Sequence, residues 1–101
     1  MKLYVLVRKD LSRSQQAVQA GHAVAEWLLE YRKENLWDNG ILVYLKAGNS
    51  EEALEHFYNN LYNDDRKIAT FYEPDIGVEM TAFAILGTDD IPDMLNDFRL
   101  L

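Results

Sequence analysis

His22 and Asp75 are the residues of this 101-residue chain that could perform acid–base chemistry. An imidazole titrates near neutral pH, and a carboxylate beside it fixes its tautomer and stabilises its charged form. Gln19 precedes His22 by one helical turn, so its amide could donate a hydrogen bond to a carbonyl group on the same side. General acid–base catalysis needs a group of this kind within reach of the proton that it moves. This is the chemistry that the three residue types could perform.

Each of these residues also has a structural interpretation. A lone histidine on a helix is commonly half-buried and hydrogen-bonded to a neighbour. Asp75 could cap its own turn beside Pro74 and Gly77. Gln19 could lie on a solvated helix face. Residue type and spacing alone leave both interpretations open.

Several other chemistries are excluded or disfavoured. The chain has no cysteine, which rules out disulfides, a thiolate nucleophile and a thiolate metal site. Ser12 and Ser14 are better interpreted as helix caps than as nucleophiles, because no nucleophile elbow surrounds them. Glu73, Asp75 and Glu79 are only an acid-rich stretch, whereas divalent cations need several converging oxygen ligands. We expect no metal and no cofactor.

The charge of the chain is unevenly distributed. The net charge is −7, but residues 1–50 hold seven Lys or Arg against five acids and residues 51–101 hold three against twelve. A face that binds anions is therefore expected in the first half. Arg8, Lys9 and Arg13 lie there near the start of a predicted helix, where free backbone N–H groups and the helix dipole favour phosphate. These three residues could bind phosphate, or they could simply be solvated charges near a loop, and their type and spacing leave both interpretations open.

Four strands and three helices are predicted to position these side chains. Short runs rich in β-branched and aromatic residues predict strands over 2–8, 41–46, 67–72 and 81–86. Three- and four-residue periodicity and capping signals predict helices over 14–31, 51–62 and about 89–98. The segment 73–77, with its Pro and Gly, is a predicted loop.

The first predicted helix has an apolar and a polar side. Ser12 is its expected N-cap, with Ser14 as the alternative. An apolar stripe for packing on a sheet recurs at helical spacing: Ala17, Ala20, Gly21, Val24, Trp27, Leu28 and Tyr31. A polar flank is expected from Gln15, Gln19, His22 and Glu26. Gly21 is expected to mark a close approach of two backbones.

The order β-α-β-α-β-β-α predicts one α/β domain over residues 1–101, with a small mixed four-stranded sheet and its helices on one face. A ferredoxin-like arrangement fits the same order. The apolar run Leu3–Val7 is far too short to span a bilayer. We expect a soluble, cytoplasmic protein with no membrane contact.

The chain resembles the type II peptidyl-tRNA hydrolases in two segments and their context. Tyr4–Leu11 followed by Gln19-Ala20-Gly21-His22-Ala23 is similar to the opening signature of that family. A strand at 41–46, a helix start at Ser50-Glu51-Glu52 and the loop Asp75-Ile76-Gly77 follow in the family's order. The similarity extends from about Lys2 to Gly87. It departs from the family pattern at Ser12-Arg13-Ser14, where the family has a longer stretch with an active-site lysine, and in the shorter loop before Thr81.

The resemblance implies a mixed four-stranded sheet flanked by helices, a homodimer, and hydrolysis of the ester between a peptide and the 3′ end of tRNA. It assigns His22 and Asp75 to catalysis, and Arg8, Lys9, Arg13, Gln19 and Thr81 to substrate binding. Arg13 is the only basic substitute for the family lysine. A binding module that has lost the chemistry is the first alternative, with Trp27, Tyr31 or Trp37 as contact residues. A ferredoxin-like domain that binds a small regulatory ligand is the second.

Overall fold

The computed structural model covers residues 1–101 and contains one mixed sheet with three α-helices. The strands are β1 (Leu3–Val7), β2 (Leu42–Lys46), β3 (Ile68–Glu73), β4 (Glu79–Leu86) and β5 (Arg99–Leu100). The helices are α1 (Arg13–Tyr31), α2 (Glu51–Leu61) and α3 (Ile91–Met94), with short 3-10 turns η1 (Arg32–Glu34) and η2 (Pro74–Ile76). The α/β class and the first six predicted elements are confirmed, with boundaries displaced by no more than two residues.

The strand order of the sheet is β3-β4-β1-β2-β5. β1 and β2 are parallel, with α1 connecting them, whereas β4 is antiparallel to β1 and to β3. The sheet has five strands instead of the predicted four. The ferredoxin-like alternative is wrong, because that fold places another strand between the two strands of each β-α-β unit, and here β1 and β2 are direct neighbours.

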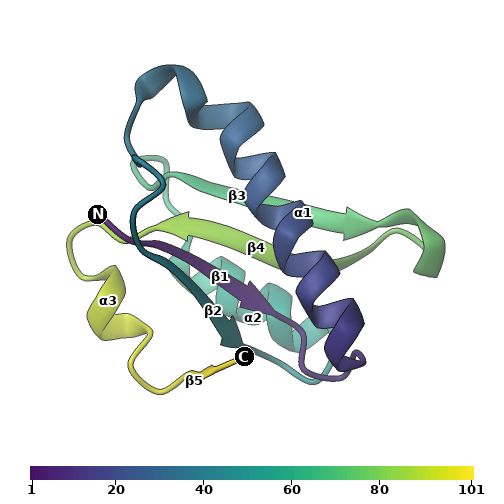
Figure 1. Cartoon of the computed structure of the whole chain (residues 1–101). Coiled ribbons are helices and arrows are strands. Elements are labelled where there is room, and N and C mark those ends of the chain that lie inside the picture. Colours follow the sequence, from purple (N-terminus) through teal and green to yellow (C-terminus); the bar gives the residue numbers. More distant parts are fainter.

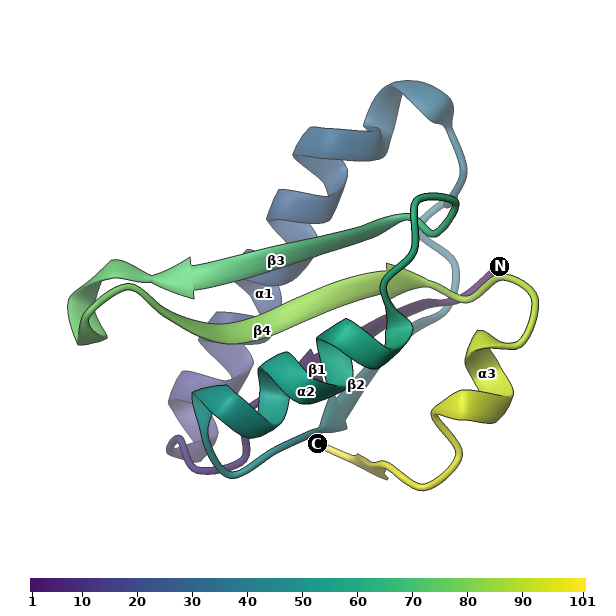
Figure 2. The ribbon, with the colours of Figure 1, turned by 180° about the vertical axis from the view of Figure 1, so that it is seen from behind.

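Helices cover both faces of the sheet, not one as predicted. α1 crosses one face (Figure 1), and α2 and α3 lie on the other, where the view from behind shows them in front of the strands (Figure 2). β1 is buried on both sides for this reason, and all five of its residues are inaccessible or nearly so. A strand covered on both faces has a continuous apolar sequence, as β1 has, because neither of its sides meets water.

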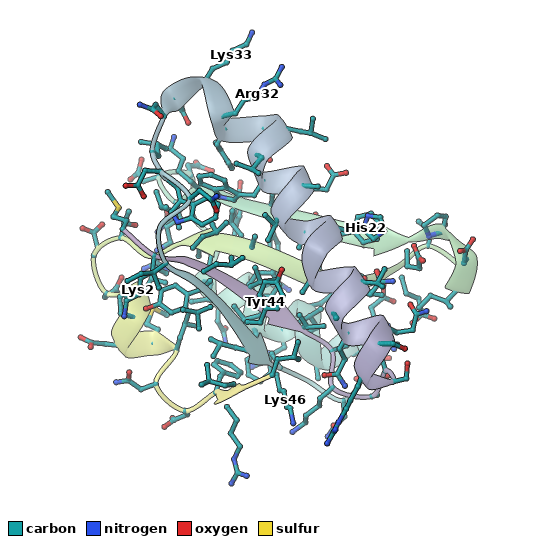
Figure 3. The ribbon with its side chains drawn as sticks, in the orientation of Figure 1. Lys2, His22, Arg32, Lys33, Tyr44 and Lys46 are labelled. Atoms are coloured by element: carbon teal, nitrogen blue, oxygen red, sulfur yellow. The ribbon has the colours of Figure 1, made fainter.

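α1 begins where the sequence predicts. The hydroxyl of Ser12 accepts a hydrogen bond from the backbone N–H of Gln15, so Ser12 is the N-cap. The helix then runs the length of the molecule: Lys46 lies near its first turns, whereas Arg32 and Lys33 lie beyond its far end (Figure 3). α1 therefore separates two groups of basic residues.

Small side chains let α1 pack closely on the sheet. Ala20 and Ala23 of the helix are fully buried, and Ala82 and Ala84 of β4 belong to the same core cluster. Gly21 is not part of this contact: it is exposed, and a side chain added there would meet nothing within 4 Å. The expected close approach is instead made by the alanines, and the buried face of α1 is rotated away from Ala17 and Leu28.

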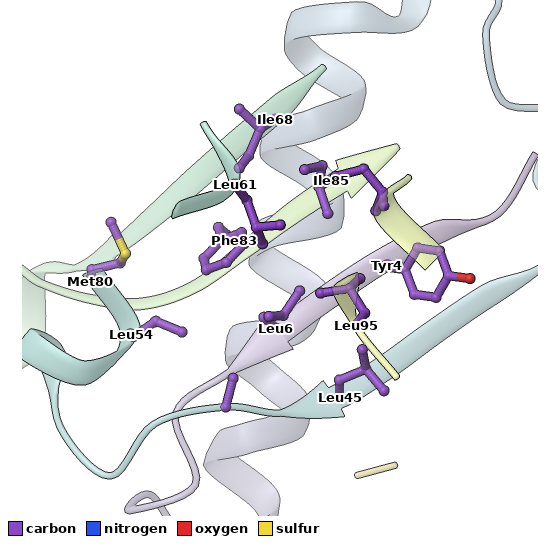
Figure 4. Close-up of a cluster of buried hydrophobic side chains, with 12 residues drawn as sticks. Tyr4, Leu6, Leu45, Leu54, Leu61, Ile68, Met80, Phe83, Ile85 and Leu95 are labelled. Carbon is purple, nitrogen blue, oxygen red and sulfur yellow. The ribbon is translucent and has the colours of Figure 1, made fainter. Parts of the chain in front are cut away.

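The opposite face holds the larger side chains of the core. Phe83 and Ile85 of β4 alternate with the two alanines and point to this face, where Leu54 and Leu61 of α2 cover them (Figure 4). Gly48, between β2 and α2, has a φ of +76°, and a Cβ there would lie 2.9 Å from the backbone nitrogen of Leu54. Glycine is needed at this position because any side chain would collide with the first turns of α2.

The C-terminal segment differs most from prediction. α3 has only four residues and ends at Met94, whereas the sequence favours a helix to about residue 98. Arg99 and Leu100 then form β5, antiparallel to β2, with Lys46 opposite Arg99. Ile91 and Leu95 bury their side chains in the core although the helix is shorter than predicted.

The two outer strands differ in length. β3 is six residues long, its pairing with β4 shifts register between Phe71 and Tyr72, and the hydroxyl of Tyr31 donates to the outward carbonyl of Ile68. β5 has two residues. The three α-helices are all too short or too polar to cross a membrane.

Candidate functional site

Polar side chains gather at one end of the sheet. The parallel strands β1 and β2 end there, at Val7 and Lys46, and the helices that follow them begin there. β4 starts at the same end, since its residue Ala82 pairs with Val7. In α/β proteins ligands bind at the carboxyl ends of parallel strands, beside the N-termini of the helices. The site residues predicted from sequence lie in the loop after β1 (Arg8, Lys9), on α1 (Arg13, Gln19, His22), in η2 (Asp75) and on β4 (Thr81).

Gln19 and Thr81 form a buried hydrogen bond at this end. Their exposed fractions are 1% and 0%, and the hydroxyl of Thr81 donates to Oε1 of Gln19 at 2.7 Å. Nε2 of Gln19 donates to Oε1 of Gln15 at 3.3 Å and to Oε1 of Glu73 at 3.4 Å. The amide therefore connects α1 to both β3 and β4. The expectation of a solvated helix face at Gln19 is wrong.

His22 lies one turn after Gln19 on an exposed part of α1. Its ring is stacked on that of Phe71 in β3, with centroids 4.4 Å apart and planes 7° from parallel. Neither ring nitrogen is hydrogen-bonded within the chain, so both can reach solvent or a bound molecule. His22 is therefore not the half-buried, hydrogen-bonded histidine that was the alternative interpretation of this residue.

The structure does not join His22 to Asp75. Asp75 is exposed in η2 and makes no side-chain hydrogen bond or ion pair. The carboxylate that contacts a predicted site residue is Glu73, two positions earlier on β3 and half-buried beside Gln19. From the sequence alone, Glu73 was a candidate only for a metal ligand. The sequence shows that Glu73 follows Phe71 by two residues. It does not show that this part of β3 lies beside the turn of α1 that carries Gln19 and His22.

Arg8 is held by acids instead of being open to phosphate. Its guanidinium donates from Nε and Nη2 to Asp10, at 3.0 and 2.7 Å, and from Nη1 to Glu79 at 2.7 Å and to the carbonyl of Met80 at 3.3 Å. Arg8 is only 7% exposed. The prediction that Arg8 binds phosphate therefore conflicts with this geometry, and the signal that was missed is Asp10, on the same side two residues later.

The ion pair between Arg8 and Asp10 changes the pKa of both side chains. The hydrogen bonds and charge of Arg8 lower the pKa of Asp10 below its ordinary value, against the opposing effect of burial. The hydrogen bonds from Arg8 to Asp10 and Glu79 likewise raise the pKa of the guanidinium, although burial alone would lower it. Arg8 and Asp10 are therefore charged together over the whole neutral range, and the cluster ties β1 to the start of β4.

Lys9 and Arg13 are the predicted phosphate ligands that stay accessible. Both are exposed and neither is in an ion pair. Arg13 is the first residue of α1 and borders an open hollow of about 600 Å³ together with Gln16 and Lys46. Lys46 was not predicted as a site residue. Cations near the start of a helix, with free backbone N–H groups beside them, suit an anion.

No metal centre is formed by the side chains of the chain. No three His, Asp or Glu side chains converge closely enough to hold an ion. Glu79 is paired with Arg8, and Glu73 accepts from Gln19, so two of the three acids in the acid-rich stretch already have partners. What the site contains is an exposed imidazole, a half-buried carboxylate and nearby cations.

Replacement of Thr81 by valine is expected to lower the free energy of unfolding by about 1–3 kcal/mol. Valine keeps the shape but leaves the buried oxygen of Gln19 without a donor. Urea denaturation of Thr81→Val measures the loss. Thr70→Val, on β3 with no side-chain hydrogen bond, is the matched control and should change stability by less than about 0.5 kcal/mol. Equal losses in the two variants would contradict a special role for the Gln19–Thr81 bond.

Comparison with models of known protein families finds no match for this chain, and a search among curated proteins finds none either. The function must therefore be inferred from the chemistry of the site and from the order of the sequence motifs.

Proposed function

We propose that this protein hydrolyses the ester bond of peptidyl-tRNA, releasing the peptide and free tRNA. The observation that carries the proposal is the placement of His22, exposed and without a partner, one turn from the buried Gln19–Thr81 bond. The sequence motif that resembles the type II hydrolases covers this same turn of α1. The buried bond fixes this turn of α1 on β4, so the exposed imidazole one turn further along is held on a rigid part of the helix.

His22 acts as the general base in this proposal. It takes a proton from a water molecule, the water oxygen attacks the ester carbonyl, and the 3′ oxygen of tRNA leaves with a proton. A carboxylate of the β3–η2 segment, Glu73 or Asp75, stabilises the charged imidazole during the reaction. Both donors of the Gln19 amide are already used, so Gln19 and Thr81 serve as positioning residues and not as oxyanion donors.

Lys9 and Arg13 bind phosphates of the tRNA in this proposal. They flank the start of α1, whereas His22 lies about two and a half turns beyond Arg13 along the helix. Arg13 replaces the lysine expected in this region. An acidic protein that binds RNA needs accessible cations beside the site, and Lys9, Arg13 and Lys46 are exposed at this end of the sheet.

The alternative is a binding module without activity, and the aromatic side chains that it would use as contacts are not available at the surface. Trp27 and Trp37 are 1% and 8% exposed, and their indole nitrogens donate to the carbonyls of Lys67 and Ile41. Tyr31 is half-buried and bonded to Ile68. Exposed aromatic anchors are what a tight protein contact requires. These three side chains stabilise the monomer instead, which favours the enzyme proposal.

Purified protein is expected to release peptide from peptidyl-tRNA at low salt. The rate at limiting substrate should fall at least about tenfold between 50 and 200 mM salt, because a few phosphate contacts are lost by counterion release. Release of labelled peptide measures both effects, and a short ester substrate without tRNA is the control that should respond little to salt. Absence of turnover at low salt, in an assay where an active hydrolase works, contradicts the proposal.

A further inference from the structure

A second concave surface lies on the other face of the sheet, between α2 and the C-terminal segment. The groove has a volume of about 550 Å³, within the range of ligand pockets. Its position can be followed in Figure 2, where α2 and α3 lie on the same face and β5 runs between their ends. His22, Gln19 and Thr81 do not line it.

The apolar part of the groove is aromatic. Phe57 of α2 and Phe98 before β5 are both half-buried, with ring centroids 4.9 Å apart and planes at 88°. Met94, 41% exposed, and the amide of Asn60 lie beside them. Exposed ring surface next to an amide suits a flat heterocycle, which can stack on one ring, meet the edge of the other and exchange hydrogen bonds with the amide.

The rim of the groove is cationic in a chain of net charge −7. Lys9, Lys46 and Arg99 line it against one acid, Asp97, and none of the three cations is in an ion pair. Lys46 and Arg99 are directly opposite each other in the β2–β5 pairing. Like charges at such positions repel and destabilise the pair. An anion between the two side chains would turn this repulsion into attraction.

We propose that this groove binds a nucleotide, with its base on Phe57 and Phe98 and its phosphate between Lys46 and Arg99. An aromatic floor and a paired cationic rim match the two halves of this ligand, whereas a fatty acid would need a closed apolar tunnel. The ligand is either a free nucleotide or the end of an RNA strand, since both present a base and a phosphate. The site does not depend on the proposed hydrolysis.

Titration of the whole protein with AMP, followed by NMR, tests this site. AMP should shift the signals of Phe98 and Asn60, whereas adenosine and inorganic phosphate alone should bind at least about tenfold more weakly, because each has only half of the contacts. A single-stranded RNA tetranucleotide that binds more tightly than AMP identifies an RNA end as the ligand, and weaker binding identifies a free nucleotide. Both results support the site.

Lys46→Glu is the decisive variant. It places an acid opposite Arg99, so β2 and β5 gain an attractive pair in place of a repulsive one and the fold is retained, while the phosphate meets a carboxylate. AMP affinity should fall by about tenfold or more. Lys33→Glu makes the same charge change at the far end of α1 (Figure 3) and should leave affinity within about twofold. Phe98→Leu keeps apolar volume and should weaken AMP by about tenfold through lost stacking.

The opposite results overturn the site. These are no shift at about 10 mM AMP, where even a weak site of millimolar affinity would be occupied, or equal affinity in the Lys46→Glu and Lys33→Glu variants. Binding of dodecanoate in the groove without binding of AMP would replace the nucleotide by an apolar carboxylate and would contradict the proposal. Peptide release is not used as a readout, so failure of the hydrolase proposal leaves this test unchanged.

Discussion

Replacement of His22 by alanine is expected to abolish peptide release, with a loss of about 10²–10⁴-fold in kcat, while the domain stays folded. The side chain is exposed and makes no hydrogen bond within the chain, so its removal leaves no buried group without a partner. Only the stacking on Phe71 is lost, and alanine is the better helix former. Peptide release and thermal unfolding of the same preparation separate the two effects.

His56→Ala is the matched control for His22→Ala. His56 is the only other histidine, is exposed on α2, and also has an aromatic neighbour, Phe57. Its replacement should leave peptide release unchanged. Glu73→Gln and Asp75→Asn in the same assay identify the carboxylate that supports the imidazole. If folded His22→Ala retains full activity, or if His56→Ala loses as much activity as His22→Ala, His22 is not the base.

Removal of both acids that hold Arg8 is expected to destabilise the protein by about 3 kcal/mol, since a buried charge is left without a counter-charge. The double variant Asp10→Asn and Glu79→Gln keeps oxygen acceptors near the guanidinium. The expected loss of stability is therefore at the lower end of the range of about 3–5 kcal/mol for a buried charge that loses its partner. Arg8 is 7% exposed and cannot turn to solvent without opening the start of β4. Urea denaturation at pH 7 measures the loss.

A second ion pair supplies the control for the double variant, and the lowered pKa of Asp10 predicts how the effect of the double variant depends on pH. Glu34→Gln breaks the more exposed pair with Lys67, at 3.6 Å, and should cost less than about 1 kcal/mol. Because the pKa of Asp10 is lowered in the folded state, its stabilisation is complete above the unfolded pKa of about 4 and disappears as pH falls through the lower folded pKa. The difference in free energy of unfolding between wild type and the double variant should therefore become smaller below about pH 4. A constant gap, or a cost equal to that of Glu34→Gln, contradicts this account of the Arg8 cluster.

The elements with strong local signals could be predicted from the sequence. The Ser12 cap, the continuous apolar run of β1 and the helical spacing of α2 depend on neighbours within a few residues, so local patterns suffice. β5 could not be predicted, since two residues carry no periodicity and their structure depends on pairing with a strand more than fifty positions earlier. The same pairing ends the C-terminal helix early.

The sequence indicated several residues of the candidate site but not the contacts between them. Gln19 and Thr81 were both selected, but the bond between them joins positions 62 residues apart and has no sequence signal. Gln19 and Arg8 were expected to face solvent because they are polar, and only knowledge of their buried partners would have changed that expectation. Lys46 and Arg99 were missed because each is ordinary alone, and only their cross-strand pairing makes them unusual.

Both outer strands of the sheet resist adding another chain. On β3 the register shift after Phe71 and the Tyr31 hydroxyl on the Ile68 carbonyl interrupt the row of free backbone groups that an incoming strand would need. β5, with two residues, offers too little backbone to act as a template. Growth of the sheet from molecule to molecule, the first step toward fibrous aggregates, is thus blocked at each end by a different local feature.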